Sequence, residues 1–373
     1  MTKTTKTIVI DCLSALQGGG QTYLINLFRF LPNEFRDSVR VIAIIPCDAD
    51  AIKINDQIEY IQPTFASRNI VCRLIWEKIM LASLLRQKRT DVLYCPGGFV
   101  SVFSASWKTA VAFRNMLPFD DEERKRYPYG YIRARLALLS FVQSRSFRSA
   151  DLVVFISQFG KSIIDITVGP TTGRSIVIPH GISDQFNESM NRPAGLALPD
   201  SYVSYVSILN VYKAQIEVVR AWALMKQKRQ GTEKLLLVGP ENRIYADTVR
   251  AVINELGMQD EVIILGNVTH DTLPAIYQGA VANIFASSCE NCPNILLEAL
   301  ASGKPVLCSD YQPMPEFAGN AALYFDPYKP DELAKLLCLI LDDQNLQMEM
   351  GEKARAQSVK FQWKRSAGET WKA

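Results

Sequence analysis

The feature that most constrains the fold of this chain is its alternation of short β-branched runs with longer segments of helical period. Runs such as TIVID (residues 7–11) and KLLLV (residues 234–238) are each followed by a segment whose apolar residues recur every three or four positions. This alternation is typical of βα units, whose consecutive strands lie parallel in one sheet. We therefore expect an α/β protein with doubly wound parallel sheets.

The pattern occurs twice, which indicates two domains. A polar stretch without sustained period, residues 181–202, separates the two series, and 373 residues exceed what one core usually supports. We expect Rossmann-like domains over residues 1–185 and 186–345, then helices over 346–373 that are free to pack back on the first domain. Ligands bind beyond the carboxyl ends of parallel strands, so two such domains facing each other would form a cleft.

The composition excludes several classes of protein. Apolar residues make up 48% of the chain and charged residues 21%, which argues against disorder. No apolar run reaches the roughly 18 to 20 residues of a membrane helix, and we expect no signal peptide. The cysteines lie mostly in apolar runs, and the CxxC at Cys289 and Cys292 has no second pair nearby, so we expect reduced cysteines in a cytoplasmic protein rather than a zinc site.

The charge is unevenly distributed, with a net positive first half and a net negative second half. Between residues 124 and 150 the chain has no acid, and its aromatic and aliphatic residues alternate with Arg124, Lys125, Arg126, Arg133, Arg135, Arg145 and Arg148. One interpretation is contact with an anionic membrane surface; the other is a solvated helix with extended arginine side chains. We do not expect nucleic-acid binding, because no reader motif accompanies these charges.

The most informative stretch is residues 287–303, SSCENCPNILLEALASG, which follows a predicted strand. Pro293 suits a first helical turn, so the helix amides and positive dipole end would face diphosphate or sugar oxygens. Glu298 lies among apolar residues, with Asn294 and Ser302 four positions to either side. Its buried carboxylate needs partners, which could be ribose hydroxyls of a ligand or, equally, loop amides or a basic residue of the protein.

Glycines at strand ends form a second group of candidates. Gly18, Gly19 and Gly20 follow the first strand, where backbone amides could approach a phosphate, although a tight turn explains them as well. The segment lacks the third glycine of a nicotinamide-binding fingerprint. Gly239 and Asn267 follow strands of the second half, where ordinary turns are again the alternative.

Taken together, the second half resembles the retaining family-four glycosyltransferases of GT-B fold. The resemblance rests on Glu290 and Glu298 in the pattern E-x7-E, on EALASGKPVLCSD and MPEFAGNAALYFDP, and on IPHGI, VSILNVYK, LLLVGP and VIILGNVTHDTLPAIYQGA in the same order. It covers about half of the chain with high specificity. The first half matches more loosely, through the glycine turn and FISQFGKSII.

The resemblance implies an acceptor side in the first domain and a nucleotide-sugar site in the second. Glu298 would bind the donor ribose, and Lys213 would face the diphosphate, where a fixed ammonium stabilises the leaving group. Taken alone, Lys213 would more often be a solvated residue. Gly239 and Asn267 would lie around the base. Glu290 would hold the transferred sugar together with the backbone of Asn291, Cys292, Pro293 and Asn294.

The chain departs from the family pattern at two places. Ile208 stands where many members carry an arginine, and Pro96-Gly97-Gly98 stand where many carry a histidine. Arg114, in the loop FRNMLPFDD, is a candidate for the missing cation, although a surface loop of mixed charge explains it equally well. His180 occupies a position that is usually asparagine, and we expect it to be structural.

These observations predict a retaining glycosyltransferase that moves a hexose-type sugar from a nucleotide-diphosphate sugar to a glycan or lipid-linked acceptor, in surface polysaccharide or lipopolysaccharide synthesis. No DxD-type acidic cluster lies in a suitable loop, so we expect activity without a metal and no cofactor beyond the co-substrate. We expect a cytoplasmic location at the inner face of the plasma membrane. The alternatives are a nucleotide-sugar-binding protein with reduced activity and a nucleotide-sugar epimerase of similar fold.

Overall fold

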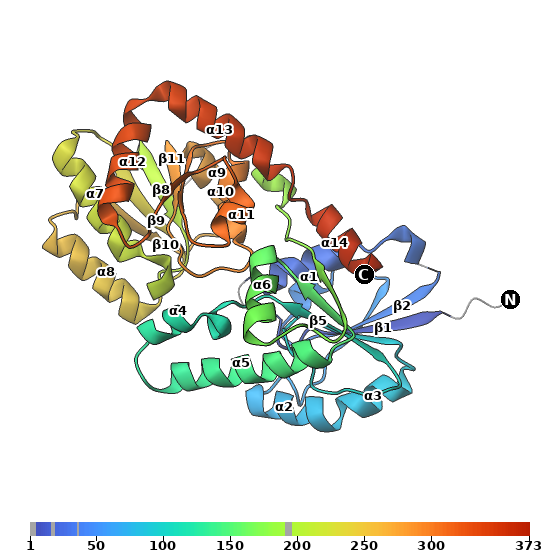
Figure 1. The fold of residues 1–373 in the computed structure, drawn as a ribbon. Coiled ribbons are helices and arrows are strands. Elements are labelled where there is room, and N and C mark those ends of the chain that lie inside the picture. The colour runs from blue at the N-terminus through green and yellow to red at the C-terminus, as the bar shows by residue number, and fades with distance from the viewer. Residues whose placement is uncertain (1–4, 16–18, 36, 191–195) are drawn as a thin grey trace. The chain divides into compact units, whose positions relative to one another are not determined.

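The computed structural model describes residues 5–15, 19–35, 37–190 and 196–373. The chain forms two units, one of residues 1–181 with 363–373 and one of residues 182–362 (Figure 1). The sequence analysis placed the boundary four residues later, within the polar stretch. Each unit has its own parallel sheet and its own hydrophobic core.

The first unit is built on a parallel sheet whose order among the described residues is β3-β2-β1-β4-β5-β6-β7. Its strands are β1 (Lys6–Asp11), β2 (Val39–Ile44), β3 (Ile58–Ile61), β4 (Val92–Cys95), β5 (Lys108–Phe113), β6 (Leu152–Phe155) and β7 (Arg174–Val177). The sequence analysis did not predict β3. This strand has only four residues, lies at the sheet edge and carries the charged Glu59, so it lacks the apolar run of the buried strands.

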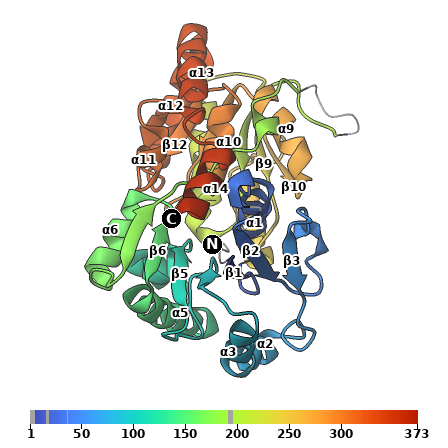
Figure 2. The same ribbon diagram turned by 90° about the vertical axis from the view of Figure 1, so that its right-hand side faces the viewer.

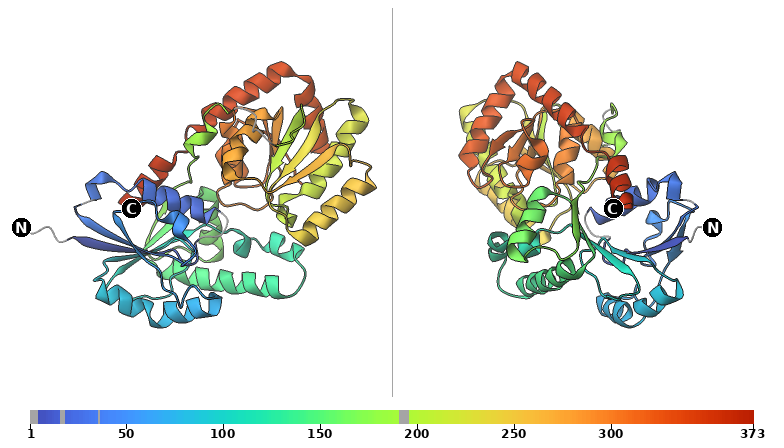
Figure 3. Two further views of the ribbon diagram at one scale, coloured as in Figure 1. Left: turned by 180° about the vertical axis from the view of Figure 1, so that it is seen from behind. Right: turned by 45° about the vertical axis from the view of Figure 1, so that its right-hand side comes forward.

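The helices of the first unit cover both faces of this sheet. They are α1 (Gly20–Arg29), α2 (Ile70–Ile79), α3 (Leu81–Gln87), α4 (Asp121–Arg126), α5 (Tyr131–Ser149), α6 (Gln158–Thr167) and α14 (Trp363–Lys372). The views agree that α2, α3 and α5 lie on one face (Figures 1 and 3). Connections between parallel strands are right-handed, so their direction across the sheet decides which face the connecting helix covers. The connection from β3 to β4, through α2 and α3, and the connection from β5 to β6, through α5, run in the same direction. The connection from β1 to β2, through α1, runs in the opposite direction.

The helix α14 joins the first unit after the chain has completed the second. It lies along α1 (Figure 2), where the buried Trp371 donates a hydrogen bond from Nε1 to the carbonyl of Leu27 at 2.9 Å. Trp363 is also buried in this core. Of the helices expected over 346–373, α14 belongs to the first unit, whereas α13 (Gln344–Ser358) belongs to the second.

The second unit repeats the doubly wound plan with strand order β10-β9-β8-β11-β12-β13 among the described residues. All five strand pairs are parallel. The strands are β8 (Tyr202–Val206), β9 (Lys234–Val238), β10 (Val262–Gly266), β11 (Ala282–Phe285), β12 (Val306–Ser309) and β13 (Leu323–Phe325). Chain direction across the sheet reverses between β8 and β11. In open α/β sheets, ligands bind beyond the carboxyl ends of the strands at such a point.

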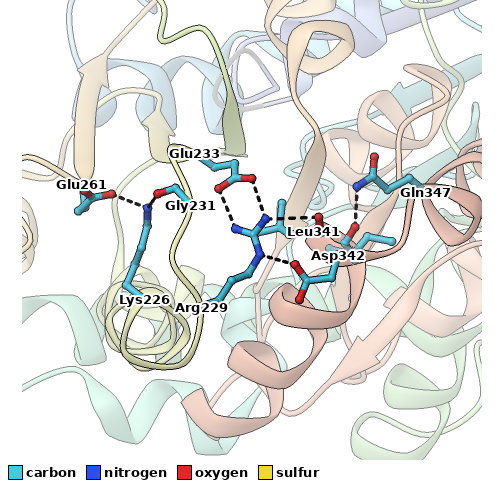
Figure 4. Close-up of polar contacts among 9 residues, drawn as sticks. Lys226, Arg229, Gly231, Glu233, Glu261, Leu341, Asp342 and Gln347 are labelled. Atoms are coloured by element: carbon cyan, nitrogen blue, oxygen red, sulfur yellow. Dashed lines mark hydrogen bonds and ion pairs between the residues drawn. The ribbon is translucent and has the colours of Figure 1, made fainter.

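The helices of this unit are α7 (Gln215–Lys228), α8 (Arg243–Glu255), α9 (Leu273–Gly279), α10 (Asn294–Ala301), α11 (Met314–Ala318), α12 (Pro330–Asp342) and α13. An ionic network joins the end of α7 to α12 and to β9 (Figure 4). Arg229 donates to both carboxylate oxygens of Glu233, at 2.8 and 3.0 Å, and to Asp342 at 2.6 Å. Lys226 pairs with Glu261 at 2.7 Å. The hydrogen bonds from Arg229 lower the pKa of Glu233.

A second charged cluster lies beneath the loop that leaves β1. Asp11, the last residue of β1, accepts a hydrogen bond from the amide of Leu13 at 3.2 Å. Glu77 of α2 is fully buried, and the nearest cation is Arg73, whose Nε lies 3.6 Å from Glu77 Oε1. Arg73 also donates to the carbonyl of Leu13 at 3.1 Å. Burial, reinforced by the nearby Asp11, raises the pKa of Glu77 from 4.5 to about 8.

We predict that Arg229→Ala lowers the free energy of unfolding of the second unit by about 1–3 kcal/mol, because Glu233 then keeps a largely buried charge without its partner. Thermal unfolding of the full chain measures this change. Arg365→Ala, which removes the exposed pair with Glu369, serves as the control and should cost less than about 1 kcal/mol. Equal losses of unfolding free energy in the two variants would show that the Arg229–Glu233 pair does not stabilise the second unit as proposed.

We also predict that stability falls with rising pH because of Glu77. In the unfolded chain this carboxyl loses its proton near pH 4.5, and in the folded protein near pH 8. Between these values the folded state binds more protons, so raising the pH favours unfolding. Glu77→Gln should flatten this slope in unfolding experiments at several pH values. The exposed Glu122→Gln is the control, and the prediction fails if both variants keep the wild-type slope.

Candidate functional site

In the second unit, the loops after β8 and β11 leave the sheet side by side at the point where strand order reverses. The two loops are joined through the carbonyl of Tyr212, which accepts hydrogen bonds from the Ser288 amide at 2.8 Å and from the Ser288 hydroxyl at 3.1 Å. The Ser287 hydroxyl donates to the same carbonyl at 3.3 Å. These bonds hold the loop that carries Lys213 against the loop that carries Glu290.

The side chains of Lys213 and Glu290 form an ion pair between these two loops. The side chain of Lys213 is 5% exposed and that of Glu290 is 16% exposed, so the pair is largely removed from water. Charges this deeply buried interact strongly, and each depends on its partner because an unpaired buried ion is costly. The structure thus brings together two of the residues predicted from the sequence.

Aromatic rings and backbone geometry hold Lys213 in place. Its ammonium lies 5.0 Å from the ring centroid of Tyr212 and 5.3 Å from that of Phe285. The hydroxyl of Tyr205 donates to the Lys213 carbonyl at 2.6 Å. The next residue, Ala214, adopts a left-handed conformation with φ of 52°, which turns the chain from the short 3-10 helix at 211–213 into α7. Lys213 is therefore fixed in the protein and is not the solvated residue that it resembles in isolation.

Glu298, in the middle of α10, has a protein partner that the sequence analysis did not identify. Nε2 of His270 lies 3.4 Å from Oε1 of Glu298, and Nδ1 of His270 lies 2.9 Å from Nε2 of Gln185. Burial raises the pKa of Glu298, although His270 opposes the shift, and the contact with Glu298 raises the pKa of His270. The sequence analysis allowed three kinds of partner for Glu298, and this contact is one of them, the pairing with a basic residue.

The remaining members of the polar stripe on α10 have different surroundings. Ser302 is buried. Its hydroxyl donates a hydrogen bond to the carbonyl of Ala299 at 2.6 Å and accepts one from the Asn283 amide at 3.2 Å, so both of its bonds lie within the core. Asn294 begins α10, and Pro293 is its N-cap, one residue before the helical turn that we expected it to occupy. The side chain of Pro293 has no polar atom with which to cap the helix. Asn291, Cys289 and Cys292 lie in the preceding loop, and within the described residues neither cysteine forms a disulfide.

Gly239 and Asn267 follow the carboxyl ends of the two neighbouring strands, β9 and β10. Gly239 has φ of 142°, and a Cβ atom there would lie 2.2 Å from the carbonyl oxygen of Ser207. A side chain is therefore excluded, and the backbone at the tip of β9 passes directly against the loop after β8. Asn267 is exposed. The predicted residues of the second unit thus share one edge of its sheet.

In the first unit, the start of α1 lies next to Arg114, which follows β5. A Cβ atom on Gly20 would lie 1.6 Å from the Ala15 carbonyl oxygen and 3.5 Å from Nη1 of Arg114, so only glycine fits. The guanidinium of Arg114 lies over the ring of Tyr23 at 4.8 Å. Gly19 is the N-cap of α1, whereas Gly18 lies outside the described residues.

Two of the positions at which the chain differs from the family pattern, Gly97 and His180, are closely packed in the first unit. Gly97, after β4, approaches the loop after β1 so closely that a Cβ atom would lie 1.9 Å from Oγ of Ser14. His180 is buried between aromatic rings, with centroid distances of 5.5 Å to Tyr23 and 5.1 Å to Trp363. These contacts are those of a packed core residue.

Residues 187–357 match the model of the family described as glycosyl transferases group 1. The chain is 26% identical over 192 residues to a D-inositol 3-phosphate glycosyltransferase of Corynebacterium glutamicum, covering 50% of this chain and 46% of that protein. It is 25% identical over 235 residues to O-antigen chain mannosyltransferase B of Escherichia coli, covering 60% of each. The chain thus spans about half the length of the curated relatives that it matches.

Among solved structures, HepE from Anabaena in complex with UDP and glucose superposes with a TM-score of 0.73 at 18% sequence identity, covering 98% of each chain. This likeness extends the shared fold to both units. Residues 187–357 also carry the paired Lys213 and Glu290 and the E-x7-E pattern on which the resemblance was based. We conclude that residues 187–357 of this chain match the glycosyl transferases group 1, and that its two parallel-sheet α/β units have the GT-B fold.

Proposed function

We propose that this protein is a glycosyltransferase that moves a hexose-type sugar from a nucleotide-diphosphate sugar to a glycan or lipid-linked acceptor, with retention of the anomeric configuration. The observation that carries the proposal is the buried Lys213–Glu290 pair where strand order reverses in the second unit. The names of the relatives support the choice of acceptor, since one matched protein is an O-antigen chain mannosyltransferase. The UDP and glucose in the HepE structure support a nucleotide-sugar donor.

Each member of the pair suits one part of such a donor. The Lys213 ammonium would stabilise negative charge on the departing diphosphate, and its confinement between two rings means that little reorganisation accompanies the reaction. The Glu290 carboxylate would accept hydrogen bonds from sugar hydroxyls. The amino end of α10 adds the positive end of a helix dipole next to this loop.

Glu298 and His270 would bind the ribose of the donor. A carboxylate of raised pKa, held by one imidazole, still has acceptor capacity for a pair of vicinal hydroxyls. Gly239 and Asn267 would lie around the base.

Retention would not require a protein nucleophile. As the donor bond loosens, an oxygen of the departing diphosphate would accept the proton of the acceptor hydroxyl, which enters on the same face of the sugar. The protein then supplies orientation and charge stabilisation. Because no DxD-type cluster lies in a suitable loop, we propose that this chemistry proceeds without a metal.

The proposed function first predicts how the protein binds nucleotides. A nucleotide diphosphate should raise the melting temperature of the wild-type chain, with a preference among UDP, GDP and ADP that identifies the donor base. Lys213→Met should weaken this binding on the order of ten- to one hundred-fold, because it removes one charge-assisted contact. Differential scanning fluorimetry with a nucleotide titration measures both effects.

Lys228→Met is a matched control, because this lysine is exposed at the end of α7 in the same unit. It should retain the wild-type nucleotide response. The proposed donor site would be wrong if Lys213→Met responded to nucleotide as the wild type does while remaining folded.

The second prediction concerns the reaction. With the preferred sugar nucleotide and a lipid-linked glycan acceptor, the chain should form a product whose new linkage keeps the donor anomeric configuration, and EDTA should not abolish turnover. Nuclear magnetic resonance of the product gives the configuration. An inverted linkage would exclude retention, and loss of turnover with EDTA would exclude the metal-free scheme.

The same assay separates the alternatives. Binding without product from any donor would indicate a nucleotide-sugar-binding protein, a possibility raised by Ile208 and by Gly97 and Gly98 at positions where related proteins carry charged or acid–base groups. Conversion of the donor sugar without an acceptor would indicate an epimerase.

A further inference from the structure

The helix α5 presents apolar and basic side chains together on its exposed side. Tyr131, Arg135, Leu138, Phe141 and Arg145 recur at intervals of three and four residues and therefore share one face. Leu138 is 63% exposed and Phe141 is 70% exposed. The opposite face holds the helix on the sheet, where the ring of Phe147 lies 5.4 Å from that of Phe113 in β5. The mixed face thus points away from the sheet.

Among the described residues, no carboxylate neutralises the arginines of this face. The helix α5 contains no Asp or Glu, and among the described residues no carboxylate forms an ion pair with Arg135 or Arg145. Arg133 and Arg148 differ, since they donate to backbone carbonyls of Arg124 and Val168. Two unpaired cations are therefore directed outward beside exposed Leu138 and Phe141.

The helix α2 adds a predominantly apolar face. Its solvent side consists of exposed aliphatic residues at intervals of three and four, and Ile79 among them is 69% exposed. The members of this face are Ile70, Val71, Leu74, Ile75, Lys78 and Ile79. The opposite side holds α2 on the sheet through the buried Trp76 and Glu77. A monomeric protein rarely exposes an apolar patch of this kind without a partner.

Both helices lie on the same face of the seven-stranded sheet, and one loop connects their surfaces (Figure 3). In that loop, between β4 and β5, the amide of Val100 donates to Ser146 of α5 at 2.9 Å, and the carbonyl of Ser101 accepts from Lys78 of α2 at 3.0 Å. Phe103 of the same loop is also exposed. The outward faces of α2 and α5 together with Phe103 are called the α2–α5 surface below.

We propose that the α2–α5 surface docks on an anionic lipid bilayer. The aliphatic and aromatic side chains would enter the boundary between head groups and acyl chains, while Arg135 and Arg145 contact lipid phosphates. Among the described residues, no helix has the length and hydropathy to cross a membrane, so this contact would be peripheral. A second copy of the chain is a poorer occupant, because a twofold contact would pair this surface with itself, and its residues on α2 and α5 include no carboxylate to pair with the arginines.

Vesicle flotation with the full chain tests this proposal. The wild type should float with vesicles of phosphatidylcholine and phosphatidylglycerol, and much less with phosphatidylcholine alone. Arg135→Glu with Arg145→Glu should lower partitioning into the anionic vesicles at least about tenfold. Leu138→Ser with Phe141→Ser, and separately Ile75→Ser with Ile79→Ser, should weaken binding at high salt, where the apolar contribution dominates.

Arg220→Glu with Lys228→Glu is the matched control, since it makes the same change in net charge at exposed positions of α7. This control should bind as the wild type does. Nucleotide-induced shifts in melting temperature should be unchanged in every surface variant, which separates failure of this proposal from failure of the donor site.

Three results would overturn the proposal. One is the absence of flotation with anionic vesicles at low salt, and another is an equal loss of binding in the α5 charge variant and the α7 control. The third is occupation of the surface by a different partner, seen as self-association or duplex DNA binding that the α5 substitutions abolish while vesicle binding persists.

Discussion

The ion pair between Lys213 and Glu290 is the interaction on which the organisation of the second unit around its site depends. It joins the loops of two strands that are neighbours in the sheet but lie far apart in the sequence. The loops are further connected by the Tyr212 carbonyl, so the pair occupies a fixed place. A buried ion pair contributes little net stability compared with apolar packing. The pair does provide, at the strand ends, the ammonium beside a carboxylate that the proposed donor chemistry requires.

The sequence was sufficient to predict both parallel sheets, because their buried strands are continuous apolar runs with β-branched residues. It was insufficient at the edge strand β3, whose composition does not differ from that of a loop. Residues 70–87 likewise form two helices that divide at Met80, where no proline or glycine in the sequence marks a division. Packing against the sheet determines both features, and the local pattern of apolar residues in the sequence does not show how a segment packs.

The candidate site was predictable where a residue is unusual in its own segment. Glu298 is conspicuous as an acid in an apolar helix, and Lys213 could be selected only by its place in a family pattern. His270 was missed because its segment, NVTHDT, resembles an ordinary polar turn. Ser302 was grouped with Glu298 by spacing, yet its hydroxyl bonds to Asn283 in the core. Spacing gives the face of a helix, whereas the neighbouring elements decide what that face meets.

The helix α14 has a consequence for how the chain acquires its structure. Trp363 and Trp371 belong to the core of the first unit, but the ribosome makes them only after the entire second unit. Until then the side of α1 that they cover is open to water, and the first sheet lacks part of its apolar cover. The first unit therefore cannot complete its core until the whole of the second unit has been synthesised.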